Sequence, residues 1–228
     1  MHKPNNKTGN NKTGWRRMPT NNPHVRIAQE YAGLTNTYDS RWSFYVDATA
    51  RATVARLPLC DSDRLLDIGC GTGVLLRRLS AIHPAARLTG VDPVPEMLAI
   101  ARRRLPSAVE LQRGWAETLP FADRQFDVVV SCNMFHYIAE PDTALREIKR
   151  VLRPDGRLVI TDWCGDYLMC RVLDAYQRLF GRAHGRVYRT RECAALVEQA
   201  GYATVDTERY KIDWRWGLMT ARFTAISD

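Results

Sequence analysis

A glycine-rich turn that joins an apolar run to a helical pattern constrains the fold more than any other feature of the sequence. The stretch Leu65-Leu-Asp-Ile-Gly-Cys-Gly-Thr-Gly73 starts with apolar residues, carries an acid at position 67 and has glycine at positions 69, 71 and 73. A helical pattern follows from Val74 to Ile82. This order predicts a strand, a tight turn and a helix N-terminus, which is where α/β sheets hold nucleotides.

The spacing of the three glycines narrows the ligand class. A dinucleotide fingerprint reads G-x-G-x-x-G, whereas the position three residues after Gly71 is Val74 and the third glycine comes one residue early. The spacing therefore argues against a dinucleotide pyrophosphate at this turn. A nicotinamide-linked oxidoreductase is kept as an alternative, and tight binding of NADH would favour it.

Four stretches in order carry a resemblance to a known family. The turn from Asp67 to Gly73 matches (D/E)-x-G-x-G-x-G, the first motif of the class I S-adenosylmethionine-dependent methyltransferases. The other three are the acid that ends Arg87-Leu-Thr-Gly-Val-Asp92, the run Gly114-Trp-Ala-Glu-Thr-Leu-Pro-Phe121, and the turn Leu152-Arg-Pro-Asp-Gly156. Over roughly residues 64–162 the chain resembles the ubiquinone/menaquinone-biosynthesis-like (methyltransferase type 11) branch. One departure is Asp155, which replaces the first glycine of the family's Pro-Gly-Gly turn, although Asp-Gly is itself a favoured turn pair.

The resemblance implies an α/β fold of the Rossmann-like, doubly wound kind. It includes a seven-stranded, mostly parallel sheet with an antiparallel C-terminal hairpin and a helical N-terminal lid. The alternation of strand and helix patterns up to Trp163 agrees, because parallel strands need crossover helices. Periodicity also indicates a helix over about 40–57, a helix after Trp163 that runs to Phe180, and terminal strands around 203–210 and 218–226.

We expect three parts along the chain. With 228 residues and 45% hydrophobic content, it can bury one substantial core. Residues 1–24 are expected to be a disordered basic tail, 25–60 to form lid helices that bring Tyr31 and Tyr38 towards the site, and 61–228 to form the methyltransferase domain. Within that domain, a helical insertion is expected at about 166–200.

The resemblance also implies the cofactor, S-adenosyl-L-methionine, with S-adenosyl-L-homocysteine as the product. This ligand carries an ammonium, a sulfonium and an adenosine, so a carboxylate beside exposed backbone amides suits it. Asp92 lies about 20 residues after the glycine turn, where such folds hydrogen-bond the ribose, and it is also placed to cap the helix after Pro93. The residues expected at the cofactor are Asp67, Gly69, Cys70, Gly71, Gly73, Asp92, Pro93, Met97, Ala116, Glu117 and Ser131, with the Ala-Glu pair against the adenine.

Catalysis is expected in two segments, because acceptors of open α/β sheets lie beyond the carboxyl ends of the strands. These segments are Ser131-Cys-Asn-Met-Phe-His-Tyr137 and Asp162-Trp-Cys-Gly-Asp166. His136 is the candidate base, since imidazole exchanges protons near neutral pH, and Asp162 is a candidate to orient or deprotonate the acceptor. Tyr137, which stands where relatives carry a second histidine, completes the catalytic set. The alternative for His136 is a structural role in packing its loop, and His184 is a further candidate from the insertion.

The cysteines and the charge restrict the classes of site and partner. Six cysteines, at positions 60, 70, 132, 164, 170 and 193, form no C-x-x-C pair and no zinc-finger spacing, so reduced thiols and no metal are expected. Residues 1–26 hold six basic side chains and no acid, while the remaining 27 basic and 25 acidic side chains nearly cancel. The tail cannot offset its ordering entropy, and a basic arm that contacts RNA or anionic lipid is the alternative.

These features predict a methyltransferase that acts on a small-molecule acceptor, hydrophobic or ring-bearing, by in-line displacement. The alternatives are an RNA or phospholipid-headgroup methyltransferase that uses the basic tail, and a noncatalytic protein that binds S-adenosylmethionine. A nucleic-acid partner is not expected, because the domain is near neutral and the fourth strand is not followed by an Asn/Asp-Pro-Pro-aromatic turn. No apolar run approaches the roughly 20 residues that span a bilayer, so a cytoplasmic monomer or homodimer is expected, with peripheral membrane contact left open.

Overall fold

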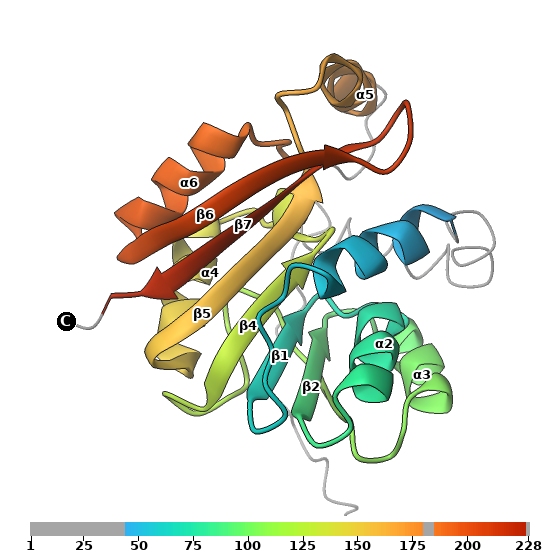
Figure 1. Cartoon of the computed structure of the whole chain (residues 1–228), viewed down its shortest axis with the longest axis vertical. Helices are drawn as coiled ribbons and strands as arrows, with labels where there is room; N and C mark the ends of the chain where they lie inside the picture. The colour runs from blue at the N-terminus through green and yellow to red at the C-terminus, as the bar shows by residue number, and fades with distance from the viewer. Residues whose placement is uncertain (1–43, 180–184, 227–228) are drawn as a thin grey trace, which may run out of the picture.

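The computed structural model describes residues 44–179 and 185–226, which form one α/β sandwich (Figure 1). Its strands are β1 (Arg64–Ile68), β2 (Arg87–Asp92), β3 (Glu110–Arg113), β4 (Phe126–Cys132), β5 (Leu152–Trp163), β6 (Tyr202–Lys211) and β7 (Gly217–Ala225). Its helices are a first one over 44–54, α2 (Val74–Ile82), α3 (Pro95–Arg104), the 3-10 turn η1 (Phe135–Tyr137), α4 (Pro141–Val151), α5 (Leu168–Leu179) and α6 (Thr190–Gln199).

The seven strands form one sheet in the order β3-β2-β1-β4-β5-β7-β6. Strands β1 to β5 pair in parallel, whereas β7 is antiparallel to both β5 and β6. The predicted Rossmann-like sheet with an antiparallel C-terminal hairpin is thus confirmed. The strand order reverses between β1 and β4, and such a switch point leaves a crevice at the carboxyl ends of the strands.

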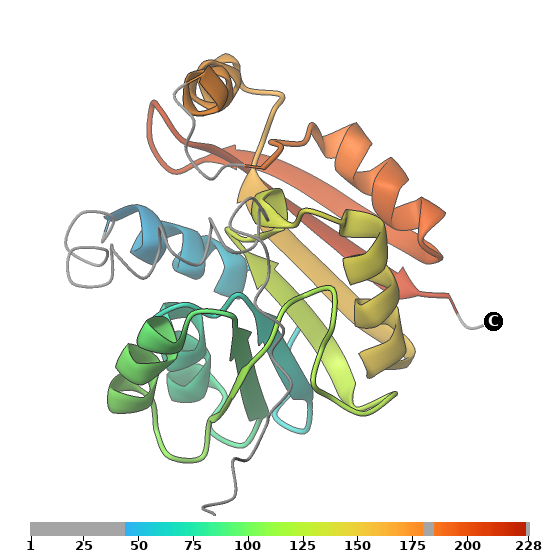
Figure 2. The same ribbon diagram turned by 180° about the vertical axis from the view of Figure 1, so that it is seen from behind.

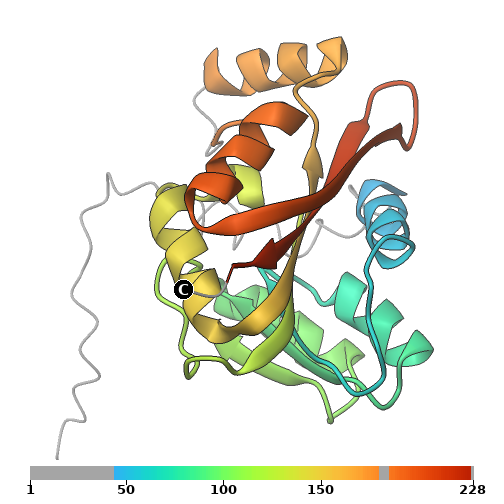
Figure 3. The same cartoon turned by 60° about the vertical axis from the view of Figure 1, so that its left-hand side comes forward.

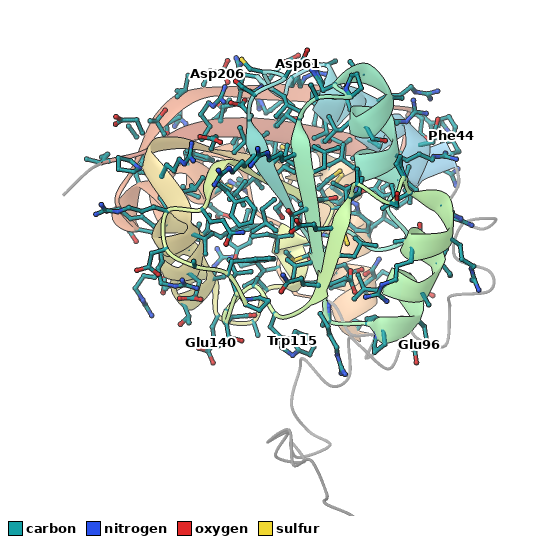
Figure 4. The ribbon with its side chains drawn as sticks, turned by 90° about the horizontal axis from the view of Figure 1, so that it is seen from below. Phe44, Asp61, Glu96, Trp115, Glu140 and Asp206 are labelled. Atoms are coloured by element: carbon teal, nitrogen blue, oxygen red, sulfur yellow. The ribbon has the colours of Figure 1, made fainter. Side chains whose placement is uncertain are left out.

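Two apolar layers cover the two faces of the sheet, and strand alternation assigns the residues to them. In β1, Leu65 packs with the layer under α2, α3 and the helix 44–54, while Leu66 packs with the layer under α4 and α6. In β4, Val128 and Val130 join the first layer and Val129 joins the second, as a period of two requires. Figures 2 and 3 show the two groups of helices on opposite sides of the sheet, and Figure 4 shows side chains filling the space between.

The first described helix is shorter than the periodicity over 40–57 indicates. It ends at residue 54, and a turn follows at 55–56 before Pro58. The physical reason is that a residue before proline is disfavoured in the helical region, so Leu57 is drawn towards extended backbone. The tail 1–24, the lid tyrosines Tyr31 and Tyr38, and His184 lie outside the described residues.

The first residues of β5 contain Asp155, the departure from the family's Pro-Gly-Gly turn. Asp155 has a φ of 59°, in the left-handed region. Glycine reaches this region without strain, and aspartate tolerates it better than most residues do. The substitution of the first glycine of the Pro-Gly-Gly turn therefore leaves the backbone path intact. Within the described ranges, no helix is long and apolar enough to cross a bilayer.

Candidate functional site

A cleft opens at the carboxyl ends of β1, β2 and β4, beside the helix 44–54. It encloses about 1100 Å³ outside the protein atoms, part of it open solvent, so a ligand of drug size fits. The sequence-predicted residues that line it are Asp67, Gly69, Cys70, Gly71, Asp92, Pro93, Met97, Ala116, Glu117 and Tyr137. The other lining residues are Val46, Ala50, Ile68, Thr72, Val74, Leu75, Val94, Gly114, Trp115, Cys132, Asn133, Met134 and Ile138.

The three glycines of the turn have different surroundings, although all have positive φ, at 70°, 53° and 80°. A Cβ at Gly69 would meet Met134 Cγ at 2.3 Å, so this glycine lets the loop after β4 approach the turn. A Cβ at Gly73 would meet Leu105 Cδ1 at 2.8 Å, so this glycine packs the start of α2 against the end of α3. A Cβ at Gly71 would meet nothing within 4 Å. Gly71 is thus the position where the cleft is open to the bare main chain.

Gly73 and Ser131 were predicted at the cofactor, but neither lines the cleft. Gly73 sits behind the turn, against Leu105. Ser131 is fully buried between Ile68 of β1 and Ile160 of β5. Its Oγ has no hydrogen-bond partner among the described residues. The next residue, Cys132, lines the cleft in its place, because successive side chains of a strand point to opposite sides.

Asp92 joins the end of β2 to the glycine turn. Its Oδ2 accepts a hydrogen bond from the Gly71 N–H at 2.9 Å, and its Oδ1 accepts one from the Val94 N–H at 2.8 Å. Burial raises the pKa of this carboxyl to about 6, and the two N–H donors oppose that rise. The Val94 bond also supports the start of α3, where Val94 is the N-cap residue. Asp92 therefore serves the local backbone and lines the cleft at the same time.

Asp67 presents a second buried carboxyl to the cleft. The residue is 2% exposed, and no hydrogen bond or ion pair holds its carboxylate within the described part of the chain. Burial, and next the neighbouring Asp92 carboxylate, raise its pKa well above the usual range. A buried carboxyl in this state gains most from a cationic ligand, because a nearby positive charge favours the ionised form.

The Ala116–Glu117 pair lines the cleft from the loop after β3, and residues of α4, distant in the sequence, hold this loop in place. Arg150 of α4 donates to the carbonyl oxygens of Leu119 at 3.0 Å and Phe121 at 2.8 Å. The Leu119 N–H in turn donates to the Glu147 carboxylate at 3.0 Å. These bonds fix the loop after β3 against α4, and the sequence motif alone does not reveal them.

His136 and Asp162 form a buried pair at the same edge of the sheet. The distance from His136 Nδ1 to Asp162 Oδ1 is 2.7 Å, and Asp162 Oδ2 accepts the His136 backbone N–H at 2.9 Å. The Trp163 N–H also donates to Asp162 Oδ1, at 2.7 Å. Since an ionised carboxylate only accepts, this arrangement assigns a proton to Nδ1 and the basic lone pair of the ring to Nε2.

The pair lies beneath the cleft surface rather than on it. The His136 and Asp162 side chains are 4% and 3% exposed, and neither lines the cleft, whereas the adjoining Tyr137 does. The His136 ring lies 4.0 Å from the Tyr137 ring, centroid to centroid, and stacks on Trp163 at 5.4 Å. The structure thus brings the three predicted catalytic residues together, with Tyr137 between the cleft and the imidazole.

A tyrosine that sequence reasoning missed ties the first helix to this region. The Tyr45 hydroxyl donates to Asn133 Oδ1 at 2.7 Å and accepts a hydrogen bond from Trp163 Nε1. Asn133 lines the cleft and has a φ of 57°, a left-handed conformation that asparagine tolerates. The only sequence signal for this link was the helical periodicity over about 40–57, which includes Tyr45. The link explains how Val46, the next residue, and Ala50, about one turn further along the helix, come to face the cleft.

Apart from Cys60, which is exposed, the cysteines are packed as small, largely buried groups. Cys70 and Cys132 line the cleft, and burial raises the pKa of Cys132 to about 12 and that of Cys70 well above its usual range. The Cys170 thiol donates to the Gly217 carbonyl at 3.3 Å, and Cys193 is fully buried. Thiols with raised pKa values stay protonated at neutral pH, so they are poor nucleophiles and poor metal ligands.

Comparison with known proteins matches the central part of the chain to a known domain family. Residues 66–160, which hold the glycine turn, Asp92 and the strands β1 to β5 around the cleft, match the family model described as a methyltransferase domain. The chain carries a methyltransferase domain. The demethylmenaquinone methyltransferase of Thermotoga maritima is 37% identical to this chain over 138 residues, which cover 60% of this chain and 58% of that protein. Solved neighbours of the same fold include proteins described as S-adenosylmethionine-dependent methyltransferases.

Two solved structures share the fold over most of this chain. A methyltransferase of Haloferax volcanii, solved in complex with the Trm112 activator, superposes with a TM-score of 0.77 at 22% identity, covering 87% of this chain and 98% of that one. A second, from Thermotoga maritima, gives 0.71 at 22% identity, covering 87% and 99%. At these identities the likeness shows the fold alone. The chain spans between 35% and 59% of the length of the curated relatives that it matches.

Proposed function

We propose that this methyltransferase transfers the methyl group of S-adenosylmethionine to a small-molecule acceptor that is hydrophobic or ring-bearing. The observation that carries the proposal is the cleft itself, where the carboxyls of Asp67 and Asp92 and the bare main chain of Gly71 meet at the switch point of the sheet. The bound cofactor supplies a methyl group on a sulfonium, an electrophile that needs no further activation. The protein has to align the acceptor with it, and alignment lowers a barrier by several kcal/mol.

The residues present fit this cofactor. Asp67 offers a carboxylate without a partner in the described chain to an ammonium, and Asp92 offers acceptor lone pairs to the ribose hydroxyls. Ala116 and Glu117 stand on the wall formed by the loop after β3, where an adenine would lie. Open space at the Gly71 Cβ position gives the ligand room beside the main chain.

Cofactor binding is expected to release protons from Asp67. Burial and Asp92 raise its pKa in the free protein, whereas a bound ammonium would lower it, so up to about one proton leaves per site. Affinity should therefore rise with pH across the interval between the two pKa values. Titration calorimetry at about pH 7.5, in buffers of different ionisation enthalpy, measures the release. Asp92, whose pKa is about 6, is already ionised there, so Asp67→Asn should abolish the release. Identical heats in all buffers would contradict the assignment.

Replacing Asp92 by alanine is expected to weaken cofactor binding. The variant loses hydrogen bonds between a charged group and the ribose, each worth about 1.5–3 kcal/mol, or about ten- to a hundredfold in affinity. It also frees the Gly71 and Val94 N–H groups that Asp92 now binds, so the thermal midpoint should be recorded beside the calorimetric affinity. An unchanged affinity in a folded variant would show that the ribose lies elsewhere.

The His136–Asp162 pair supports acid-base work on the acceptor. Asp162 holds the Nδ1 proton and fixes the ring orientation, so Nε2 is the ring nitrogen that would take a proton from an acceptor hydroxyl, thiol or amine. A base is needed only where the acceptor is protonated at the working pH. Tyr137 adjoins both the imidazole and the cleft, so it is the side chain placed to orient the acceptor.

The acceptor class rests on the cleft wall and on the curated relatives. Apolar side chains such as Ile138, Met134 and Val46 also line the cleft. One relative is named for a quinone acceptor and another is named an O-methyltransferase. Both names fit a ring-bearing acceptor with an oxygen or carbon nucleophile.

Transfer of a labelled methyl group tests the proposal. The protein is incubated with methyl-labelled S-adenosylmethionine and a panel of quinols, phenols, catechols, thiols and amines, with Asp92→Ala as the impaired control. Label in an extracted acceptor, together with an equal amount of S-adenosylhomocysteine, is the expected result. Binding of the cofactor without transfer to any acceptor would favour a noncatalytic protein, and tight NADH binding without S-adenosylmethionine binding would favour an oxidoreductase.

A further inference from the structure

The helix α5 turns an apolar stripe away from the protein body. Leu168, Val172, Tyr176 and Leu179 are exposed by 72%, 53%, 51% and 81%. Their spacing of four, four and three residues places them along one side of the helix. The solvent side of a surface helix is ordinarily polar, so an apolar stripe of this length marks a contact surface.

The opposite side of α5 is anchored, which fixes the direction of the stripe. Cys170 is fully buried and its thiol donates to the Gly217 carbonyl at the start of β7. Leu173 packs against the buried cluster that contains Trp216 and Leu218. Figures 1 and 3 show α5 at one end of the molecule beside the β6–β7 loop. The helix therefore cannot rotate its stripe inward without breaking these contacts.

The β6–β7 loop adds an exposed aromatic side chain to the same end. Trp214 is 72% exposed, and the Arg215 guanidinium lies over its ring at 5.2 Å. Lys211 lies over the ring of Tyr167, just before α5, at 5.6 Å. Aromatic rings with cations beside them suit the boundary between an apolar phase and a polar one.

The charge of this region is strongly positive. The segment 171–192 holds six arginines, one aspartate and one glutamate, a net charge of +4, and the Glu192 carboxylate lies 3.5 Å from the Arg186 guanidinium. Arg171, Arg186, Arg189 and Arg191 are exposed. Basic residues that flank an apolar helical stripe are the signature of a helix that lies in the interface of an anionic membrane.

A second copy of the chain fits the stripe poorly. A helix of 12 residues is about 18 Å long and about 10 Å wide, so its side offers roughly 200 Å². A stable interface buries about 800 Å² on each partner. A two-fold contact would also place the cationic segment near its own copy, and like charges repel.

We propose that α5 and Trp214 form a surface that docks on an anionic lipid bilayer, with the apolar stripe inserted between the headgroups and the exposed arginines around it. The apolar residues supply insertion and the cations supply attraction to the negative surface. This inference does not depend on which acceptor the methyltransferase uses.

Vesicle flotation with the full chain tests this surface. Two kinds of vesicle are used, one of phosphatidylcholine alone and one of phosphatidylcholine and phosphatidylglycerol in equal parts. The wild type should float with the anionic vesicles, and added salt should reduce the bound fraction. The variant Leu168→Gln/Val172→Gln/Leu179→Gln, which changes only exposed positions and keeps the charge, should partition at least about tenfold less, since each tenfold is about 1.4 kcal/mol.

A matched variant controls for the loss of apolar surface in general. Ile82, Val205 and Ile226 are exposed by 56%, 61% and 51% at places away from α5, and changing all three to glutamine should leave flotation unchanged. Equal flotation of the wild type and the α5 variant would overturn the proposal and assign any binding to the basic tail. Absence of flotation in the wild type, or a dimer on gel filtration that only the α5 variant loses, would also overturn it.

Discussion

Replacing His136 by alanine is expected to lower the rate of methyl transfer by about 100-fold or more, the usual scale for a positioned acid or base. The reason is that His136 Nδ1 is held by Asp162 at 2.7 Å, so the ring presents Nε2 as its basic atom. Cofactor affinity should change little, because Asp67, Asp92 and Gly71 form a separate part of the cleft. Turnover is measured with the first acceptor found by the label-transfer screen, and affinity by calorimetry.

Two further variants separate a proton-transfer role from a packing role. Asp162→Asn keeps the shape but allows the wrong imidazole tautomer, so turnover should fall and its pH profile should change. His83 offers a matched control, because its Nδ1 lies 3.0 Å from an Asp61 oxygen in an exposed pair far from the cleft. His83→Ala should therefore leave turnover unchanged.

A structural role for His136 makes the opposite prediction. His136 is buried against Trp163, and its backbone carbonyl accepts the Arg186 N–H at 3.0 Å. If the ring only packs the loop, His136→Ala would lower the thermal midpoint while each folded molecule kept its full rate. Intact turnover in the folded variant would leave alignment alone as the source of catalysis.

The fold and many of the residues that line the cleft could be predicted because their signals are local. The glycine turn, the acid that ends β2 and the Ala-Glu pair each lie within a few residues of a strand end. Parallel strands bring their carboxyl ends to one edge, so local signals converge in space. Asp67, Asp92, Ala116 and Glu117 accordingly all line the cleft.

The remaining parts of the site depend on register and on contacts between distant residues. Ser131 was expected at the cofactor, but its neighbour Cys132 is the residue that lines the cleft. A difference of one residue along a strand is enough to move a side chain to the other side of the sheet. Arg150 holds the loop after β3 from 31 positions away, and Tyr45 holds Asn133 from 88 positions away. No periodicity or motif encodes such pairs, since they follow from the packing of whole elements.

The burial of the His136–Asp162 pair also escapes sequence reasoning. His136 follows β4 and Asp162 lies near the end of β5, and these two strands are neighbours in the sheet. Their depth beneath Tyr137 follows from η1 and from Trp163, whose ring stacks on the imidazole. The motif predicts that His136, Tyr137 and Asp162 lie at the same edge of the sheet. Only the packing of the aromatic rings shows that Tyr137 lines the cleft and that His136 and Asp162 do not.

Gly71→Ala is expected to weaken cofactor binding by about 100-fold, which is about 2.7 kcal/mol, while the protein remains folded. The new Cβ would meet no protein atom within 4 Å, so it would stand in the open space where the cleft meets the main chain. With a φ of 53° at this position, alanine in the left-handed region costs about 1–2 kcal/mol of stability. Calorimetry and a thermal melt on the same preparation measure the two effects.

Gly73→Ala is the matched control for the same turn. Its φ of 80° carries a similar backbone cost, and its Cβ would press on Leu105 at 2.8 Å, so the variant should lose at least as much stability as Gly71→Ala. Because Gly73 does not line the cleft, its cofactor affinity should stay close to that of the wild type. Gly71→Ala should therefore lose more cofactor affinity than Gly73→Ala, whereas Gly73→Ala should lose at least as much thermal stability. Equal affinities in both variants would mean that the cofactor does not approach the backbone at residue 71. The assignment of Asp67 and Asp92 to the same cofactor would then be wrong as well.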